Sequence, residues 1–228
     1  MNVALIQTDN RPYLYYVQLT QQVNKKQCNK LGIAYEFIDS SSYSFTYMQF
    51  AKLYVVREFL KRSTADLVIL LDTDAWIHNP LSLSELLYEL HDSNHHGAFS
   101  RDLYLPNNTY INSGSFIIKN NVFVRSMYDS VLMRFEADRM THTDKELVGM
   151  HGGWCDQYYL SNYVYENRRH FTIFAPSILN TPDGMVLRHN WYKNKKMYED
   201  CGAILREEQE DASWDRQYDK MDFPNKRA

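Results

Sequence analysis

Hydrophobic and polar residues alternate in blocks over about the first 70 residues, and the blocks predict strands and helices in turn. Residues 3–7 and 67–71 are short continuous apolar runs, which are typical of buried strands, and residues 33–38 mix apolar with β-favouring residues. The intervening stretch up to Gly32, a typical helix stop, is helical in composition, and residues 47–61 repeat apolar side chains at helical spacing. Three strands separated by two helices predict a parallel α/β sheet.

Polar side chains follow the first and third of these strands and predict where a site lies. Asp9 comes directly after the first strand, and Asp72 and Asp74 follow the third. Sites in parallel α/β sheets lie beyond the carboxyl ends of the strands, so we expect these carboxylates to share one crevice. Thr8 and Asn10 flank Asp9 at this edge. All three residues are placed either to bind a ligand or to cap the following helix.

The later part of the chain continues the pattern after Pro80. The expected helices cover residues 83–90, 122–135 and 156–165, and the expected strands cover residues 97–100, 116–118 and 171–174. From residue 206 onward charged residues dominate. We therefore expect one α/β domain over residues 1–205, followed by a charged tail over residues 206–228 that either wraps the domain or leads into a further one.

Composition and charge exclude several classes of protein. The 228 residues are 44% hydrophobic and 23% charged, which is typical of a globular protein, and the net charge of −3 argues against a nucleic-acid binder. Cys28, Cys155 and Cys201 are widely spaced and predict neither a disulfide framework nor a zinc site. No apolar run approaches the roughly 20 residues that span a bilayer, and the N-terminus turns polar too soon for a signal peptide. We expect a cytoplasmic protein.

The Asp72-Thr73-Asp74 triplet is the first candidate for chemistry. Residues i and i+2 of an extended chain point the same way, so both carboxylates can converge on a divalent cation such as Mn²⁺ or Mg²⁺. The alternative is a pair of solvated aspartates in a turn. Haloacid-dehalogenase-type phosphatases also place Asp-x-Asp after an apolar strand, but they have Thr or Val where this chain has Trp76. Their motif follows the first strand, whereas a β-α-β-α unit precedes it here.

Several further blocks, in the same order along the chain, resemble metal-dependent glycosyltransferases of the GT-A fold. These blocks are residues 50–53 (FAKL), 70–75 (LLDTDA), 77–80 (IHNP), 112–120 (NSGSFIIKN) and 156–157 (DQ). Residues 77–80 and 112–120 resemble the galactosyl/α-1,6-mannosyltransferase family, and residues 156–157 resemble glycogenin-like retaining enzymes. Compact glycosyltransferases of large algal viruses are similar in size. For a viral chain the expected location is the host-cell cytoplasm.

The resemblance implies both a fold and an activity. The fold is the α/β GT-A (Rossmann-like) nucleotide-diphospho-sugar transferase fold, with a central, mostly parallel sheet flanked by helices. Residues 1–120 are expected to bind the nucleotide sugar, and residues 121–205 to complete the metal and acceptor side. The expected reaction moves a sugar from a UDP- or GDP-sugar to a glycan or a protein-linked sugar, with Mn²⁺ or Mg²⁺ as cofactor. A non-catalytic nucleotide-sugar-binding module is the alternative.

The resemblance also implies a set of metal and diphosphate ligands. Asp72 and Asp74 are expected to hold the cation. His189 is the expected third ligand because similar enzymes carry a late His followed six residues later by Lys, here Lys195. Tyr192 replaces the usual Gly between them, and a lone His is otherwise a hydrogen-bonded structural residue. Lys193 and Lys195 are expected to give positive charge to the diphosphate, and Thr8, Asp9 and Asn10 to bind the base or ribose.

The remaining expected roles concern the donor sugar. Lys52 is expected to contact the donor sugar or phosphate, unless it is a surface lysine whose stem covers the helix. Asn112 and the Gly114 backbone are expected to line the sugar pocket, although Gly114 is also suited to a tight turn. Asp156 is the general base if the reaction inverts configuration. If configuration is retained, which the resemblance favours, Asp156 and Gln157 position the donor; the remaining alternative for Asp156 is a helix cap.

Overall fold

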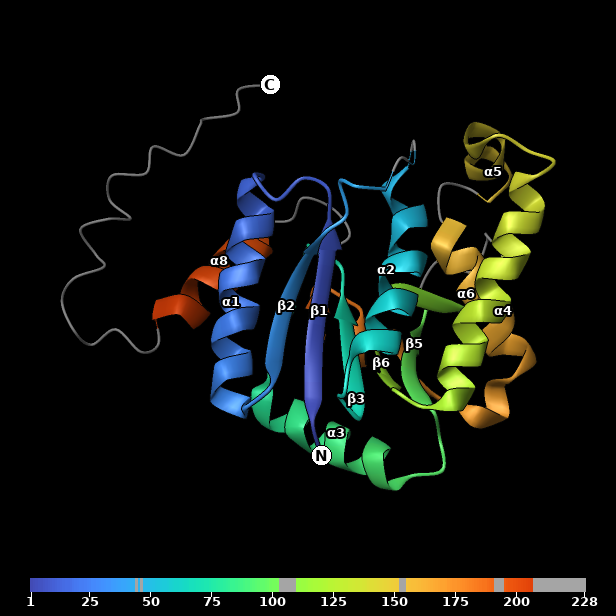
Figure 1. Ribbon diagram of the computed structural model, residues 1–228. Coiled ribbons are helices and arrows are strands. Elements are labelled where there is room, and N and C mark those ends of the chain that lie inside the picture. Colours follow the sequence, from blue (N-terminus) through green and yellow to red (C-terminus); the bar gives the residue numbers. More distant parts are fainter. Residues whose placement is uncertain (44, 46, 103–109, 152–154, 191–194, 207–228) are drawn as a thin grey trace.

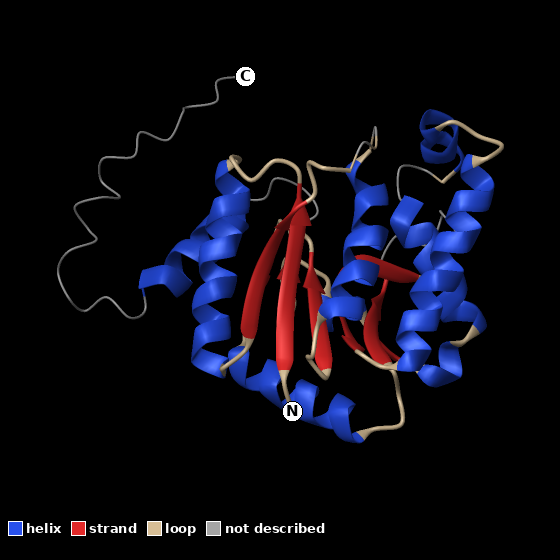
Figure 2. Cartoon of the chain, in the orientation of Figure 1, coloured by secondary structure: helices blue, strands red, loops and turns tan. Residues whose placement is uncertain are grey.

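The computed structural model describes residues 1–43, 45, 47–102, 110–151, 155–190 and 195–206 (Figure 1). A central six-stranded sheet has the order β2-β1-β3-β6-β5-β7 and is flanked by helices (Figure 2). The sheet strands are β1 (Val3–Asp9), β2 (Ala34–Asp39), β3 (Leu67–Leu71), β5 (Gly97–Arg101), β6 (Ile111–Lys119) and β7 (Thr172–Phe174). The prediction of an α/β fold with a central, mostly parallel sheet is confirmed.

Strand direction decides which residues share an edge of the sheet. β1 is parallel to β2 and β3, and β5 is parallel to β7. β6 is antiparallel to both of its neighbours, β3 and β5. Consequently β6 begins at the edge where β1, β3 and β5 end. A second, two-stranded antiparallel sheet joins β4 (Ala75–Ile77) to β8 (Leu187–His189).

Two hydrophobic cores cover the two faces of the sheet because successive strand residues point to opposite sides. Ala4 and Ile6 of β1 belong to the core with α2, α4 and α6, whereas Leu5 belongs to the core with α1 and α3. The helices are α1 (Tyr15–Leu31), α2 (Met48–Arg62), α3 (Pro80–Asp92), α4 (Val122–Arg139), α5 (Asp144–Met150), α6 (Cys155–Glu166), α7 (Pro176–Leu179) and α8 (Lys195–Arg206), with a 3₁₀ turn at Arg168–His170. No helix among the described residues is long and apolar enough to cross a membrane.

Two details at the ends of α1 test the sequence predictions. Gly32 ends α1 in the left-handed conformation with a φ of 65°, which confirms it as the helix stop. The expectation that Asp9 or Asn10 caps this helix is wrong. Leu14 is the N-cap, and its apolar side chain makes no capping hydrogen bond. The Asp9 carboxylate is bound by Arg11 and Thr73 instead.

Several short elements were not predicted from the hydrophobic pattern, and they lie close to the proposed site. β4 and β8 have three residues each, too few for any periodicity to emerge. The last helix, α8, packs Met197, Cys201 and Ile204 against α1 and the buried Trp76. Residues 207–228, most of the predicted charged tail, lie outside the described residues.

Candidate functional site

The side chains that were predicted to share a crevice lie together at the edge where β1, β3 and β5 end and β6 begins. Asp72 directly follows β3, and its backbone N–H donates to the carbonyl of Gly114 at 2.6 Å. In the β3–β6 ladder Leu71 lies opposite Ser115. Residues 112–114 therefore meet the Asp72–Asp74 turn because β6 runs antiparallel. The sequence placed both segments in one site by family resemblance; the strand direction supplies the physical reason.

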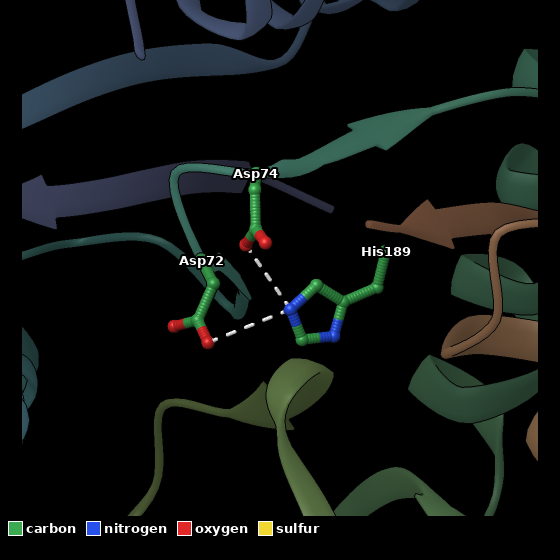
Figure 3. A group of neighbouring side chains, drawn as sticks. All are labelled: Asp72, Asp74 and His189. Carbon is green, nitrogen blue, oxygen red and sulfur yellow. Dashed lines mark hydrogen bonds and ion pairs between the residues drawn. The ribbon is translucent and has the colours of Figure 1, made fainter. Parts of the chain in front are cut away.

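Asp72, Asp74 and His189 form a group that fits a metal ion. One potential ligand atom from each residue lies within 4.8 Å of the others (Figure 3). The Nε2 atom of His189 is 3.1 Å from Asp74 Oδ1 and 3.8 Å from Asp72 Oδ2. The pairing of β4 with β8, which sets His189 opposite Ala75, brings the imidazole to the aspartates. Two carboxylates and one imidazole are a donor set that several divalent cations accept, Mn²⁺ among them.

Asn180 fixes the orientation of the His189 ring. The Nδ1 atom of His189 is 2.8 Å from Asn180 Oδ1, and both residues are buried. Since the amide oxygen only accepts, Nδ1 carries a proton, and Nε2 faces Asp72 and Asp74, where it would become a ligand atom once a cation replaced its proton. Burial lowers the pKa of His189, but the carboxylates of Asp74 and Asp72 outweigh it and the pKa stands above its ordinary value. The ring is thus both hydrogen-bonded and directed at the aspartates.

Gly114 permits the close approach of the strand to this group. A Cβ atom built on Gly114 would lie 2.1 Å from His189 Cε1 and 2.9 Å from Asp72 Oδ2, both far too short for contact. Gly114 lies within β6, so the alternative of a tight turn is wrong. Its N–H donates to Asn112 Oδ1 at 2.7 Å, which ties the predicted sugar-pocket residue Asn112 to the backbone.

Lys52 is buried between two carboxylates and is not a surface lysine. It is 8% exposed, and its Nζ lies 2.8 Å from Asp72 Oδ1 and 2.6 Å from Asp156 Oδ2. Burial lowers the pKa of Lys52, but the charges of Asp156 and Asp72 outweigh it and the pKa rises above its ordinary value. The ammonium group therefore stays charged and joins the proposed metal site to Asp156.

Asp156 and Gln157 begin α6 and face the same strand as Lys52. Asp156 is 3% exposed, and its Oδ2 accepts a hydrogen bond from Ser113 Oγ at 2.8 Å. Gln157 Oε1 accepts from the Ser113 N–H at 3.1 Å, and Gln157 Nε2 donates to Asp102 Oδ2. Both the oxygen and the nitrogen of the Gln157 amide are thus engaged, so its orientation is set by the protein.

The residues predicted to bind the base or ribose differ in whether their side chains are already hydrogen-bonded within the protein or are exposed. Asp9 is buried and accepts hydrogen bonds from Arg11 Nε at 2.9 Å and Thr73 Oγ1 at 2.8 Å. Burial raises the pKa of Asp9, but these hydrogen bonds outweigh it and hold the pKa below its ordinary value. Thr8 Oγ1 donates to the Ile38 carbonyl at 2.8 Å. Asn10 is exposed at the same edge.

Two predicted residues have no described side chain to set against the prediction. Two other residues of the site were not predicted from the sequence. Lys193 lies outside the described residues, and Lys195 begins α8 without a described side chain. Asp102 was missed although it follows a predicted strand, as Asp9 and Asp72 do. Asn180 was missed because no pattern in the sequence marks the hydrogen bond that it makes with His189.

The comparisons with known proteins bear on the fold. No protein-family model matches the sequence, and no curated protein is significantly similar to it. Solved structures do match. A glycosyltransferase involved in glycosylation of the major capsid of PBCV-1 is 14% identical with a TM-score of 0.62, covering 87% of this chain and 99% of that chain. Apo GlyE, a glycosyltransferase of Streptococcus pneumoniae TIGR4, is 13% identical with a TM-score of 0.56, covering 96% and 64%.

A third match involves a structure with bound sugars. The galactosyltransferase LgtC, in complex with donor and acceptor sugar analogues, is 13% identical with a TM-score of 0.50, covering 89% of this chain and 96% of that chain. The chain spans less than two thirds of GlyE but nearly all of the PBCV-1 and LgtC chains. At these identities the likeness shows that the chain has the GT-A fold of glycosyltransferases, as the sequence motifs implied.

Proposed function

We propose that this protein transfers a sugar from a nucleotide-diphosphate donor, a UDP- or GDP-sugar, to a glycan or protein-linked sugar. The observation that carries the proposal is the convergence of Asp72, Asp74 and His189 at the carboxyl edge of a GT-A sheet. Folds of this kind bind ligands at that edge. Nucleotide-diphosphate donors need a cation there because the leaving diphosphate gains negative charge.

Asp72, Asp74 and His189 would hold a divalent cation, and Mn²⁺ or Mg²⁺ is the cation proposed. When bound, the cation supplies Lewis-acid stabilisation of the leaving diphosphate. Lys193 and Lys195 are proposed to add positive charge to the same group. Thr8, Asp9 and Asn10 are proposed to meet the base or ribose, within a nucleotide-sugar-binding half formed by residues 1–120.

Asp156 is better suited to positioning the donor than to deprotonating the acceptor. A general base must reach the acceptor hydroxyl, but Asp156 is 3% exposed and its Oδ2 is bound by Lys52 and Ser113. We propose that Asp156 and Gln157 position the donor sugar through Lys52 and Ser113, which they bind, and that the charge of Asp156 supports the positive charge that develops at the anomeric carbon. Lys52, Asn112 and Gly114 complete the pocket wall. Such an arrangement favours retention of configuration.

A thermal-shift panel with Mn²⁺ and UDP-, GDP- or dTDP-sugars tests the proposal. We expect one donor class to raise the melting temperature only with metal, and Asp74→Asn to abolish the shift. Asp92→Asn, a change at an aspartate whose side chain is 81% exposed, is the matched control and should retain the shift.

The products then separate glycosyl transfer from its rivals. Transfer or slow hydrolysis should release an intact sugar and a nucleoside diphosphate, whereas a phosphatase releases phosphate and a binding module releases nothing. If no nucleotide sugar stabilises the protein with metal and Asp74→Asn changes nothing, the proposed function is wrong.

A further inference from the structure

A short turn over residues 180–186 connects α7 to β8, the strand that ends at His189. The His189 N–H donates to the Thr181 carbonyl at 3.2 Å, and the Gly184 N–H donates to the same carbonyl at 2.9 Å. Asn180, which orients the imidazole, begins this turn, and His189 ends the strand that follows it. The ring and its hydrogen-bond partner therefore keep their relative positions only if the turn keeps its shape.

Two ion pairs attach this turn and β8 to α8. Arg188, next to His189 in β8, pairs with Asp200, and its Nε also donates to the Gly184 carbonyl at 3.2 Å. Lys196 of α8 pairs with Asp183 in the turn. The two pairs differ in burial, because the side chains of Arg188 and Asp200 are 14% and 21% exposed, whereas those of Lys196 and Asp183 are 36% and 75% exposed.

That difference in burial decides which ion pair contributes more to holding the turn against α8. Exposed ion pairs contribute about 0–1 kcal/mol because water competes for both partners. Removing one partner of a largely buried pair leaves the other charge without compensation, which costs considerably more. Arg188 and Asp200 therefore form the stronger attachment between the turn and α8.

Helix α8, to which these ion pairs attach the turn, is packed against α1. Met197, Cys201 and Ile204 of α8 are buried against Leu19 and Val23 of α1, and the two helices lie side by side (Figure 1). The Nζ atom of Lys26 in α1 donates to the carbonyls of Ile204 and Leu205, at 2.6 and 3.3 Å. Since α1 packs on the central sheet, α8 provides a fixed support for the turn.

We propose that Arg188 and Asp200 are positioning residues for the cation site: by binding the turn to α8 they hold His189 against Asp72 and Asp74. The proposal rests on the proposed function, because it assigns His189 to the cation. Neither Arg188 nor Asp200 is one of the three metal-ligand candidates. Contacts that orient a metal ligand commonly change metal affinity by about 10- to 100-fold when they are removed.

Titration calorimetry with Mn²⁺ alone tests the proposal. We expect Asp200→Asn to weaken Mn²⁺ binding about tenfold, and Asp200→Glu, which keeps the carboxylate, to retain most of the affinity. Asp183→Asn, which breaks the exposed pair of the same helix, should change affinity less than about twofold. Val131→Ala removes buried volume from α4, remote from the turn, and controls for general loss of stability. If Asp200→Asn binds Mn²⁺ like the wild type, or Val131→Ala weakens binding equally, the proposal fails.

Hydrogen exchange in the absence of metal gives a second, independent readout. We expect Asp200→Asn to accelerate exchange in the peptide covering residues 185–190 more than Val131→Ala does. Unchanged exchange in that peptide overturns the positioning role whatever the metal data show. If the wild type binds no Mn²⁺ but the exchange result holds, the proposed function fails while the attachment of the turn to α8 stands.

Discussion

At the scale of single residues, the site depends on buried charges that are compensated in place. A charge removed from water is costly unless it is paired and hydrogen-bonded. Lys52 meets that condition between Asp72 and Asp156, and Asp9 meets it between Arg11 and Thr73. These pairings hold the carboxylates at defined positions at this edge of the sheet, as the proposed charged donor would require.

Gly114 supplies a residue-scale prediction. Gly114→Ala places a methyl group where the His189 ring lies, so the ring must move away from Asp72 and Asp74. We expect Mn²⁺ affinity to fall about tenfold. Gly97→Ala is the matched control, since its Cβ would also be crowded, at 3.1 Å from the Ile117 carbonyl, but at the other end of the sheet. Calorimetry should find normal Mn²⁺ binding in the control, and normal binding in Gly114→Ala would contradict the geometry.

The sequence identified the candidate metal ligands better than the residues that hold site side chains in place by hydrogen bonds. Asp72, Asp74 and His189 were marked by a motif, and the structure brings them together. Asn180 and Asp102 were not identified, because each acts through one hydrogen bond to a residue distant in sequence. A hydrogen bond of that kind depends on the complete fold and has no local pattern.

At the scale of elements, long apolar runs were predictable and short strands were not. β3 has five buried residues in succession, and a continuous run of this kind is typical of a central strand. β4 and β8 exist because they pair with each other across the chain, and three residues carry too little pattern to reveal it. The reversed direction of β6 also depends on its neighbours rather than on its own sequence.

The end of α1 supplies a prediction at this scale. Gly32 has a φ of 65°, and a Cβ added there would meet nothing within 4 Å, so Gly32→Ala introduces backbone strain without a clash. We expect the free energy of unfolding to fall by about 1 kcal/mol. Gly149→Ala in α5 also meets open space but has no positive φ, and it should stabilise by about 0.5–1 kcal/mol. Urea denaturation measures both, and equal effects of the two changes would contradict the role of φ.

At the scale of the whole molecule, His96, which lies outside the candidate site, is expected to contribute to the response to mild acid. His96 stacks on Phe123 and faces His95, His170 and Lys119. Burial lowers the pKa of His96, and the neighbouring positive charges lower it further below its ordinary value of 6.5. The unfolded chain therefore binds a proton at a higher pH than the folded protein does, so stability is lost as the pH falls below that value.

His96→Gln isolates this contribution. The wild type should lose more stability than the variant between pH about 7.5 and about 5.5, because only the wild type carries the histidine that resists protonation when folded. His189 acts in the opposite direction, since its raised pKa favours the folded state in acid, and it is present in both proteins. Urea denaturation at a series of pH values measures the difference. Parallel curves for the two proteins would show that His96 does not contribute.

The position of His189 in the chain has a consequence for assembly. His189 and Asp74 are 115 residues apart, so the cation group cannot form until nearly the whole α/β domain has folded and β8 has paired with β4. A cation bound there would act as a reversible cross-link that closes a long loop and stabilises only the folded state. A fragment that ends before β8 lacks one of the three ligands. Under the proposed function, the cofactor required for catalysis would thus bind fully, and stabilise, only chains that include β8.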